Sequence, residues 1–455
     1  MERDAAGERW VVRGPARLEG VLRPPGDKSI AHRALLLAAL ARGRSELRNL
    51  PAGDDVRRTI AALAALGVRI ERSGDTHRVH GVGLHGFRPP RDPLDCGNSG
   101  TTMRLLAGLL APQPFETLLV GDASLTLRPM SRIVEPLAAM GARIACLGPR
   151  GRPPLRLGGT TTTLRAIEHR LAVDSAQVRS ALLFAGLYAA GPTCLQPASA
   201  SRDHTERMLH ALGVQITRAG ERTVLYPTRP EGWSAFAIDI PGDLSSAAFH
   251  VAFAAATPGS DLRVEGVGLN PGRGRYLALV AEHGAALRTV GAGDSLGEPR
   301  GTLRVVGGRL RPLHLAGRDT VQCIDEIPAL AAAWAVAGVP LRVRDAGELR
   351  VKESDRIAKL VELVTSFGGV ARAQPRGFDV AGSKPSRPAR FDAAGDHRLA
   401  MAAAMLALGT EGASHLLGTE CVRTSYPEFV ADLARILRPV RKGPSHPRPA
   451  VRKRA

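Results

Sequence analysis

Six short, alanine-rich apolar segments recur along this chain of 455 residues. Their starts are about 70 to 80 residues apart, and a fixed period of this length is typical of a repeated structural unit. Because each segment is apolar on most faces, we expect six buried helices whose small side chains allow close packing. The segments are KSIAHRALLLAALA from Lys28, NSGTTMRLLAGLLA from Asn98, SAQVRSALLFAGLYAA from Ser175, SSAAFHVAFAAA from Ser245, DEIPALAAAWAVA from Asp325 and DHRLAMAAAMLALG from Asp396.

A second, amphipathic stretch follows the apolar segments and in most cases ends in glycine before residues that favour strands. Glycine readily adopts the left-handed conformation that ends a helix, and the β-branched residues after it suit a strand. Each unit is therefore predicted to run as strand, buried helix, strand, outer helix and strand. These stretches lie at 59–70, 133–144, 206–216, 279–288 and 360–371, and a shorter one at 429–437 closes the sixth unit.

Six units divide naturally into three and three, and a chain of this length is expected to form two domains. The tripeptide Pro-Gly-Asp occurs at 25–27 and again at 241–243, before the first and fourth apolar segments, where it favours a turn and a hinge. We expect one α/β domain at 25–240. The second would combine 241–440 with 9–24, which include an N-terminal strand at 9–23, and a closing cleft between the two could exclude water.

The composition is that of a soluble globular protein, with 44% apolar and 23% charged residues. No apolar run approaches the length of a membrane span, and the start MERDAAGERW has no apolar signal region. The five cysteines are scattered and never form a C-x-x-C pair, which indicates reduced thiols rather than a zinc site. We therefore expect a cytoplasmic protein that does not bind a membrane and acts as a monomer.

The net charge of +19 raises the possibility of a nucleic-acid partner. Seven of these charges lie in the tail from Arg438, which has no acidic residue, so 19 − 7 leaves +12 for the remainder. Pro, Gly and Ser interrupt the tail, and we expect disorder, at least over 441–455. Aromatic residues make up only 4% and do not alternate with basic ones, which favours a pocket for small polyanions over a nucleic-acid surface.

The starts of the apolar segments carry residues suited to binding anions. Lys28, Ser29 and Arg33 open the first segment, where cations oppose the helix dipole unless an anion offsets the cost. Gly100, within CGNSGTT, leaves room for a ligand against the backbone of the second. A solvated basic turn and an ordinary capped helix start are the alternatives for these two segments. Arg128 lies in a probable loop, where an exposed arginine is usually solvated.

Further polar groups open the later segments or lie in the loops between them. They are Ser175 and Gln177, Arg202, Asp325, the run Lys352-Glu353 with Arg356, and Arg398. A loop ion pair, carboxylates favoured by the helix dipole and a surface salt-bridge network remain the structural alternatives. The chain has no Walker loop, nucleophile elbow or histidine metal triad. This set of residues favours a transferase that acts on phosphorylated or carboxylated metabolites without a metal or an organic cofactor.

The same segments resemble the 5-enolpyruvylshikimate-3-phosphate synthase family. The motifs match in order from about residue 10 to residue 437. They are PGDKSIAHRALLLAALA, DCGNSGTTMRLLAGLLA, VDSAQVRSALLFAGL, SRDHTERML, IDEIPALA, LRVKESDRI, GDHRLAMAAAMLALG and TSYPEF.

The resemblance implies two inside-out α/β domains, each of three βαβαββ units around buried helices. It also implies a 3-phosphoshikimate 1-carboxyvinyltransferase, which moves the enolpyruvyl group of phosphoenolpyruvate to the 5-hydroxyl of shikimate 3-phosphate. Implied ligands of shikimate 3-phosphate are Lys28, Ser29, Arg33, Ser175, Ala176, Gln177, Arg202, Asp325 and Lys352. Implied ligands of phosphoenolpyruvate are Lys28, Gly100, Arg128, Gln177, Arg356 and Arg398. Asp325, Glu353 and Lys28 would move the protons of the addition and the elimination.

One position departs from the family pattern. Many relatives carry a lysine where this chain has Thr424, in the segment CVRTSYP, and the neighbouring Arg423 is a possible substitute in a different register. At Gly100 the chain keeps the small residue of glyphosate-susceptible relatives, so glyphosate is expected to compete with phosphoenolpyruvate. The alternatives are the sister transferase acting on UDP-N-acetylglucosamine, whose loop cysteine has no counterpart between Cys96 and Cys146, and a basic nucleic-acid-binding protein.

Overall fold

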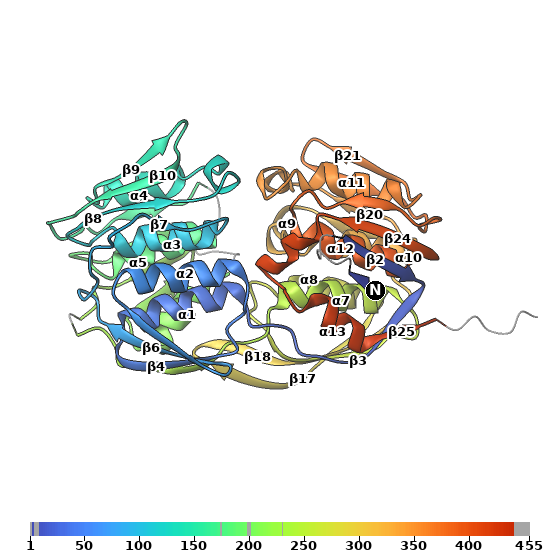
Figure 1. Ribbon diagram of the computed structural model, residues 1–455, viewed down its shortest axis with the longest axis horizontal. Helices are drawn as coiled ribbons and strands as arrows, with labels where there is room; N and C mark the ends of the chain where they lie inside the picture. The colour runs from blue at the N-terminus through green and yellow to red at the C-terminus, as the bar shows by residue number, and fades with distance from the viewer. Residues whose placement is uncertain (1, 4–8, 173–174, 198–201, 230, 441–455) are drawn as a thin grey trace, which may run out of the picture.

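The computed structural model describes residues 2–3, 9–172, 175–197, 202–229 and 231–440. It forms two lobes side by side, the first running from α1 to α6 and the second holding α7 to α13 (Figure 1). Buried apolar side chains form two separate cores, one drawn from residues 30–240 and the other from residues 10–22 and 244–436. The protein is therefore a two-domain α/β protein, as the periodic sequence predicts.

All six apolar segments form buried helices. In α7 all 13 residues are buried, and each of the other five helices has no more than two partly exposed residues, which lie near its start or, in α10, at its last residue Ala337. Alanine and glycine let these helices approach closely, since a side chain on Gly108 of one helix would collide with the backbone of Ala181 on another. The six helices are α1 (Lys28–Leu40), α3 (Gly100–Leu110), α5 (Ala176–Gly186), α7 (Leu244–Ala256), α10 (Ile327–Ala337) and α12 (His397–Leu408).

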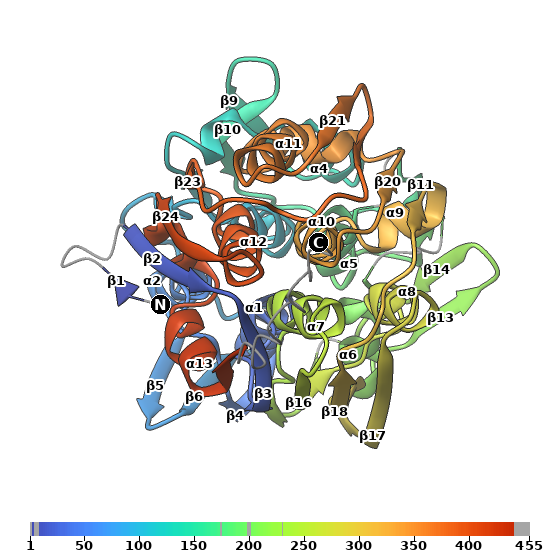
Figure 2. The ribbon, with the colours of Figure 1, turned by 90° about the vertical axis from the view of Figure 1, so that its right-hand side faces the viewer.

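The amphipathic stretches form the outer helices, which bury one face each. They are α2 (Asp54–Ala65), α4 (Ser131–Ala139), α6 (His204–Ala211), α8 (Arg275–Glu282), α11 (Arg356–Ser366) and α13 (Phe429–Ile436). A further short helix, α9 (Gly317–Gln322), precedes α10 and has no counterpart in the predicted unit. Figure 2 shows the second lobe end-on, with its three buried helices inside and its strands and outer helices around them.

Three mixed four-stranded sheets surround the buried helices of the first domain. In each sheet one parallel pair is extended by two antiparallel strands. The strand orders are β15 (Ala237–Asp239), β4 (Arg42–Arg48), β6 (Thr76–Val82) and β5 (Arg69–Ser73); β7 (Leu94–Asp95), β8 (Glu116–Val120), β10 (Arg152–Gly158) and β9 (Ile144–Gly148); and β11 (Glu168–Arg170), β12 (Thr193–Gln196), β14 (Arg222–Leu225) and β13 (Ile216–Ala219).

The second domain repeats this pattern, with a fifth strand in one sheet. The strand orders are β17 (Ala286–Ser295), β18 (Glu298–Val306), β16 (Asp261–Gly268), β3 (Ala16–Leu22) and β25 (Leu437–Pro439); β19 (Leu313–Leu315), β20 (Leu341–Val343), β22 (Gly377–Val380) and β21 (Ala371–Gln374); and β1 (Glu2–Arg3), β2 (Arg9–Gly14), β24 (Gly412–Leu417) and β23 (Arg390–Asp392).

Two expectations about the ends of the chain need correction. The strand expected at 9–23 is two strands, β2 and β3, which belong to different sheets. A side chain at Gly14 would collide with backbone carbonyls of residues 407–410, and Pro15 has no N–H to donate, so the chain changes sheet there. Arg438, expected in a disordered tail, lies in β25 opposite Arg17 of β3. Residues 441–455 lie outside the described residues.

Candidate active site

Lys28 opens α1, where a cation opposes the helix dipole and the sequence therefore predicts a compensating anion. In the structure that anion is Asp55, on the first turn of α2, whose carboxylate lies 2.8 Å from the Lys28 ammonium. Burial raises the pKa of Asp55, but the charge and the hydrogen bond of Lys28, with smaller contributions from His32 and His397, together hold the pKa below its usual range. The sequence does not identify Asp55 as a site residue, because acidic residues are common at the start of a helix.

Arg33 lies one turn further along α1 and is buried, with 2% of its surface exposed. Its guanidinium donates to Thr205 Oγ1 at 2.7 Å, to Ser180 Oγ at 2.7 Å and to the carbonyl of Ser29 at 2.8 Å. These bonds join α1 to α5 and α6. Of the predicted residues in this helix, Lys28 and Ser29 are the partly exposed ones.

The start of α3 brings Gly100 against two arginines. A Cβ at Gly100 would lie 2.6 Å from Arg104 Nη1 and 3.5 Å from Arg128 Nη1. Arg128, at the end of the short 3₁₀ turn Leu125–Leu127, donates to Asn98 Oδ1 at 2.7 Å, and its Nε is buried without a hydrogen-bond partner. Arg128 is therefore built into the site and is not the solvated loop residue that its sequence context suggests.

Arg104 is a site residue that the predicted set omits. Its guanidinium donates to Gln177 Oε1 at 2.6 Å, while Gln177 Nε2 donates to Thr101 Oγ1 at 2.9 Å. Burial lowers the pKa of Arg104 to about 10, and the nearby charge of Arg128 acts in the same direction. The residue stays charged at neutral pH. The signal that could have found it is its position one helical turn after Gly100.

Gln177 lies in the first turn of α5, after Ser175 and Ala176. Ser175 is the N-cap residue and its carbonyl accepts from Arg179 N at 3.0 Å. All three residues are partly exposed, so the start of α5 faces the same space as Gly100 and Arg104.

The second domain supplies two carboxylates to this space. Asp325, just before α10, forms an ion pair with Arg202 of the first domain and lies 3.7 Å from Lys352 Nζ and 3.8 Å from Arg356 Nη1. Arg398 Nη1 donates to its carbonyl at 2.6 Å. Burial raises the pKa of Asp325, but Lys352, Arg202, Arg398 and Arg356 together hold it well below its usual range.

Glu353 is the second carboxylate, and Arg356 Nη2 donates to it at 2.6 Å. Its other oxygen lies 3.9 Å from Arg128 Nη2, across the domain boundary. Burial raises its pKa, but the charges of Arg356, Arg128 and Lys352, and that of His397 where it is protonated, leave the pKa well below the usual range. Both carboxylates are therefore ionised at neutral pH in this structure.

Arg356 is 1% exposed, so the interpretation of LRVKESDRI as a surface salt-bridge network is wrong for this residue. Its Nε donates to Asp396 Oδ2 at 2.7 Å, which ties the start of α11 to the start of α12. Lys352 and Glu353 precede α11 in a partly exposed turn. Lys352 and Glu353 lie near charged residues of the site, whereas Asp355 caps α11 and forms an ion pair with the partly exposed Arg350.

Thr424 lies at the position where the resemblance predicts a lysine, and the structure shows its contacts. Its hydroxyl donates to the carbonyl of Cys421 at 2.7 Å, and its own backbone carbonyl packs against Gly53, before α2. Arg423 is exposed. Because Arg423 is the residue next to Thr424, its side chain points in a different direction, toward solvent.

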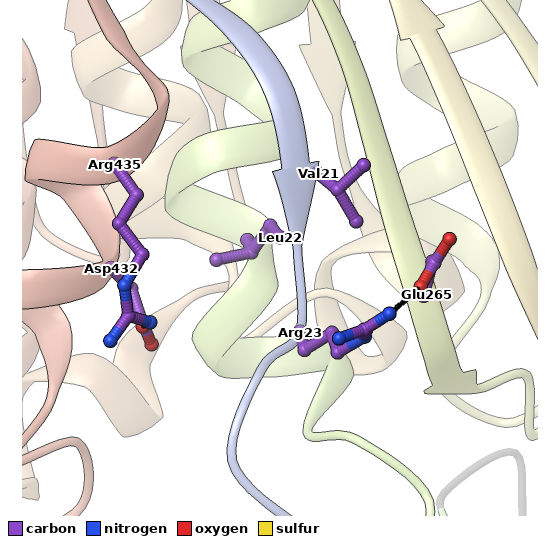
Figure 3. Close-up of a pocket in the computed structure, with 6 residues that line it drawn as sticks. All are labelled: Val21, Leu22, Arg23, Glu265, Asp432 and Arg435. Atoms are coloured by element: carbon purple, nitrogen blue, oxygen red, sulfur yellow. Dashed lines mark hydrogen bonds and ion pairs between the residues drawn. The ribbon is translucent and has the colours of Figure 1, made fainter.

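The structure thus gathers the predicted residues from both domains into one region, in which cations surround two ionised carboxylates. Two pockets of the described chain lie elsewhere. One, of about 370 Å³, lies between β3 and α13 and is lined by Val21, Leu22, Arg23, Glu265, Asp432 and Arg435 (Figure 3). A larger one of about 650 Å³ shares Arg23, Glu265 and Asp432 with it and includes no predicted residue.

No cluster of His, Cys, Asp and Glu that could hold a metal ion occurs among the described residues. Over the same part of the chain, no helix has the length and apolar character needed to cross a membrane.

Comparisons with known proteins address the family and the fold of the chain. The family model for EPSP synthase (3-phosphoshikimate 1-carboxyvinyltransferase) matches residues 12–433. A 3-phosphoshikimate 1-carboxyvinyltransferase from Acidithiobacillus ferrooxidans is 46% identical, over 93% of this chain and 96% of the relative. One from Herpetosiphon aurantiacus is 45% identical, over 94% and 99%. The solved structure of EPSP synthase from Acinetobacter baumannii superposes with a TM-score of 0.84 at 36% identity, covering 94% of this chain and 98% of that one.

Proposed function

The chain belongs to the EPSP synthase family, and we propose that the region between its domains is where it carries out the family reaction. The enzyme transfers the enolpyruvyl group of phosphoenolpyruvate to the 5-hydroxyl of shikimate 3-phosphate, releasing phosphate, on the shikimate pathway to aromatic amino acids. The observation that carries the proposal is Asp325, a carboxylate held among Lys352, Arg202, Arg398 and Arg356. Such a group can accept a proton beside two bound polyanions.

Shikimate 3-phosphate is assigned to the side of the site nearest the hinge. Its proposed ligands are Lys28, Ser29, Arg33, Ser175, Ala176, Gln177, Arg202, Asp325 and Lys352. Lys28 and Arg202 are partly exposed and now pair with Asp55 and Asp325, so a phosphate can take over part of these interactions. Arg33 already donates most of its hydrogen bonds to protein groups, and its contribution is to fix the position of the start of α1.

Phosphoenolpyruvate is assigned to the arginine-rich side. Its proposed ligands are Lys28, Gly100, Arg128, Gln177, Arg356 and Arg398. Arginine binds carboxylate and phosphate through its planar fork, and the free backbone at Gly100 allows a close approach. The absence of a cation at Thr424 places more of this task on Arg128 and Arg398.

The reaction proceeds by addition and then elimination. The 5-hydroxyl oxygen attacks the central carbon of phosphoenolpyruvate, and Asp325 takes the hydroxyl proton. A proton added to the methylene carbon completes the tetrahedral intermediate, and removal of one proton from the resulting methyl group expels phosphate. Glu353, with Lys28, is the proposed donor and acceptor on the carbon.

Substrate binding prepares the two carboxylates for these steps. The four cations around Asp325 lower its pKa, although one of them, Arg356, is already shared with Glu353 and Asp396. When a phosphate and a second carboxylate arrive, they share those cations, and the pKa values of Asp325 and Glu353 rise toward the range in which proton transfer is effective.

A turnover assay with purified protein tests the function. Phosphoenolpyruvate is supplied with shikimate 3-phosphate or with UDP-N-acetylglucosamine, and phosphate and the enolpyruvyl product are both measured. Product with shikimate 3-phosphate alone supports the proposal. Phosphate release with only the nucleotide sugar would refute it and favour the sister transferase.

We also propose domain boundaries at 25–240 and at 9–24 with 241–440, and a monomeric, cytoplasmic enzyme without a nucleic-acid partner. The two separate apolar cores support the boundaries. Light scattering on the purified protein measures its mass, and 48.1 kDa is expected. A variant that ends at Val440 lacks the basic tail and should keep its kinetic constants. If this variant still shows salt-sensitive DNA binding, the proposal that the enzyme has no nucleic-acid partner is wrong.

A further inference from the structure

The two segments that connect the domains pair with each other. Asp27 N donates to the carbonyl of Pro241 at 2.7 Å, and Asp243 N donates to the carbonyl of Pro25 at 2.7 Å. Gly26 and Gly242 form an antiparallel bridge between these bonds. The repeated Pro-Gly-Asp therefore forms one junction, from which α1 and α7 start into opposite domains.

Each aspartate of this junction caps its helix. Asp27 Oδ1 accepts from Ile30 N at 3.0 Å, and Asp243 Oδ1 accepts from Ser245 N at 2.8 Å. The capping carboxylates are buried, and a cation between them is needed to compensate their charge.

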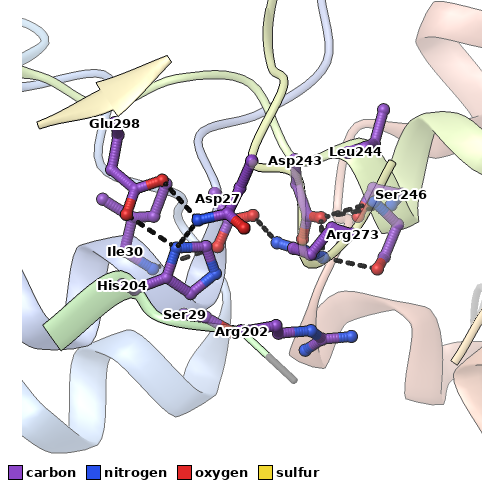
Figure 4. Close-up of polar contacts among 12 residues, drawn as sticks. Asp27, Ser29, Ile30, Arg202, His204, Asp243, Leu244, Ser246, Arg273 and Glu298 are labelled. Atoms are coloured by element: carbon purple, nitrogen blue, oxygen red, sulfur yellow. Dashed lines mark hydrogen bonds and ion pairs between the residues drawn. The ribbon is translucent and has the colours of Figure 1, made fainter. Parts of the chain in front are cut away.

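Arg273, in the loop before α8, supplies that cation and is 3% exposed. Its Nη1 donates to Asp27, and its Nη2 donates to Asp243 at 3.0 Å (Figure 4). One planar guanidinium thereby fixes the starts of two helices in different domains relative to each other. An ammonium group lacks the fork geometry that this requires.

A chain of contacts leads from Arg273 to the active site. Arg273 Nη2 also donates to the hydroxyl of Ser245, which in turn donates to Glu326 Oε1. Glu326 is 2% exposed, directly follows Asp325 in sequence and lies 4.0 Å from Arg202. Because Arg202 also pairs with Asp325, the position of Glu326 bears on the position of the catalytic base.

We infer that Arg273, acting through Ser245 and Glu326, is a positioning residue for the transfer reaction. It sets the Arg202–Asp325 pair and the start of α1, with Lys28, at the right separation across the closed site. The inference rests on the proposed function, since Asp325 and Lys28 have their catalytic roles from it. Neither Arg273 nor Ser245 belongs to the proposed substrate ligands.

Ser245→Ala removes the hydroxyl that bonds to both Arg273 and Glu326, and it changes no charged group. The matched control is Ser246→Ala on the same helix turn, because Ser246 interacts with Asp243 through its backbone N–H. We expect Ser245→Ala to lower kcat by about tenfold to a hundredfold, as small displacements of reacting groups do. The KM for phosphoenolpyruvate should change by less than about twofold. Ser246→Ala should retain both constants.

Arg273→Lys is the second variant, with Arg304→Lys as control, since Arg304 forms an exposed ion pair with Asp261. We expect Arg273→Lys to lower kcat and to raise the KM for shikimate 3-phosphate more than that for phosphoenolpyruvate. The rates are divided by the fraction of folded protein.

A lower Tm with wild-type kcat per folded molecule, in Ser245→Ala and in any folded Arg273→Lys, would overturn the inference and leave Arg273 a structural residue. If Arg273→Lys does not fold, Ser245→Ala decides. Wild-type protein in the same assay separates the two proposals, because a wild type without product contradicts the function itself.

Discussion

Gly100 lies where any side chain would disturb two arginines. A methyl group there would be 2.6 Å from Arg104 Nη1, so Arg104 would have to leave Gln177. We expect Gly100→Ala to raise the KM for phosphoenolpyruvate about tenfold, the equivalent of one charge-assisted hydrogen bond, and to weaken inhibition by glyphosate in parallel. Steady-state kinetics measure both. Gly191→Ala, whose Cβ would meet only Ala166 Cβ at 3.4 Å, serves as the control.

Asp325 is the proposed base of the addition step. Asp325→Asn keeps the shape but cannot accept the hydroxyl proton, so we expect kcat to fall by a factor of about 100 to 10,000. Single-turnover measurements with both substrates test this. Asp261→Asn, which removes an exposed carboxylate, should leave the rate unchanged. A variant Asp325→Asn with more than a tenth of the wild-type rate would remove Asp325 from its role as base.

Among single residues, the sequence identifies as site residues those that depart from the usual preference for their position in a helix. It misses site residues that follow this preference. Lys28 is conspicuous because a cation at a helix start is unfavourable, while Asp55, its partner, follows the usual preference and carries no signal. Arg104 is hidden for a similar reason, since arginine is a common helix residue. Which charges face inward depends on contacts between domains, such as Arg202 with Asp325, that local sequence does not encode.

Among the elements, the first turns of the buried helices contribute both to the stability of the fold and to the shape of the site. Ser99 caps α3: its hydroxyl oxygen accepts from Thr102 N at 3.1 Å and from Thr102 Oγ1 at 2.7 Å. We expect Ser99→Ala to lower the free energy of unfolding by about 1–2 kcal/mol and to raise the KM for phosphoenolpyruvate, because the backbone at Gly100 loosens. Denaturant titration and kinetics measure the two effects. An unchanged stability would show that water replaces the cap; Ser73→Ala, on an exposed strand end, is the control.

Helices are the elements that the sequence predicts best. The six apolar segments and six amphipathic stretches all form helices. They are predictable because the spacing of apolar residues in a sequence follows the buried face of the helix. The strand at 9–23 is wrong in one respect: its division into β2 and β3 follows from a close approach of Gly14 to residues 407–410, far away in sequence. The helix α9 has no apolar periodicity and could not be predicted from it.

For the molecule as a whole, charged side chains of both domains form ion pairs across the boundary between them. Arg128 with Glu353, Arg132 with Glu348 and Arg202 with Asp325 all cross the boundary. The sequence predicts that two domains face a cleft, and the structure adds which charged side chains of the two domains pair with each other. The proposed substrate sites use the same cations, so binding of the substrates would compete with these ion pairs between the domains.

Three buried histidines, His32, His250 and His397, make stability sensitive to acid. Burial lowers their pKa values to about 3, about 4 and about 4, whereas an unfolded chain protonates histidine near 6.5. As the pH falls from 6.5 toward 4, the unfolded state therefore gains protons that the folded state does not. Asp325, Glu353 and Asp396 have lowered pKa values in the folded state, so they begin to lose their contribution only near the lower end of this window, where the unfolded chain protonates carboxylates, at about pH 4 to 4.5.

Linkage then gives a slope of about 1.4 kcal/mol per pH unit for each histidine, or about 4 kcal/mol per unit for the three near pH 5. Denaturant titrations at pH 7, 6 and 5 measure it as a fall in the free energy of unfolding. His250 packs against Tyr426 and Phe429, so His250→Phe can fill the same space and should reduce the slope by about a third. A slope that is the same in this variant would mean that His250 takes up its proton in the folded state as well, and that its burial does not keep it neutral.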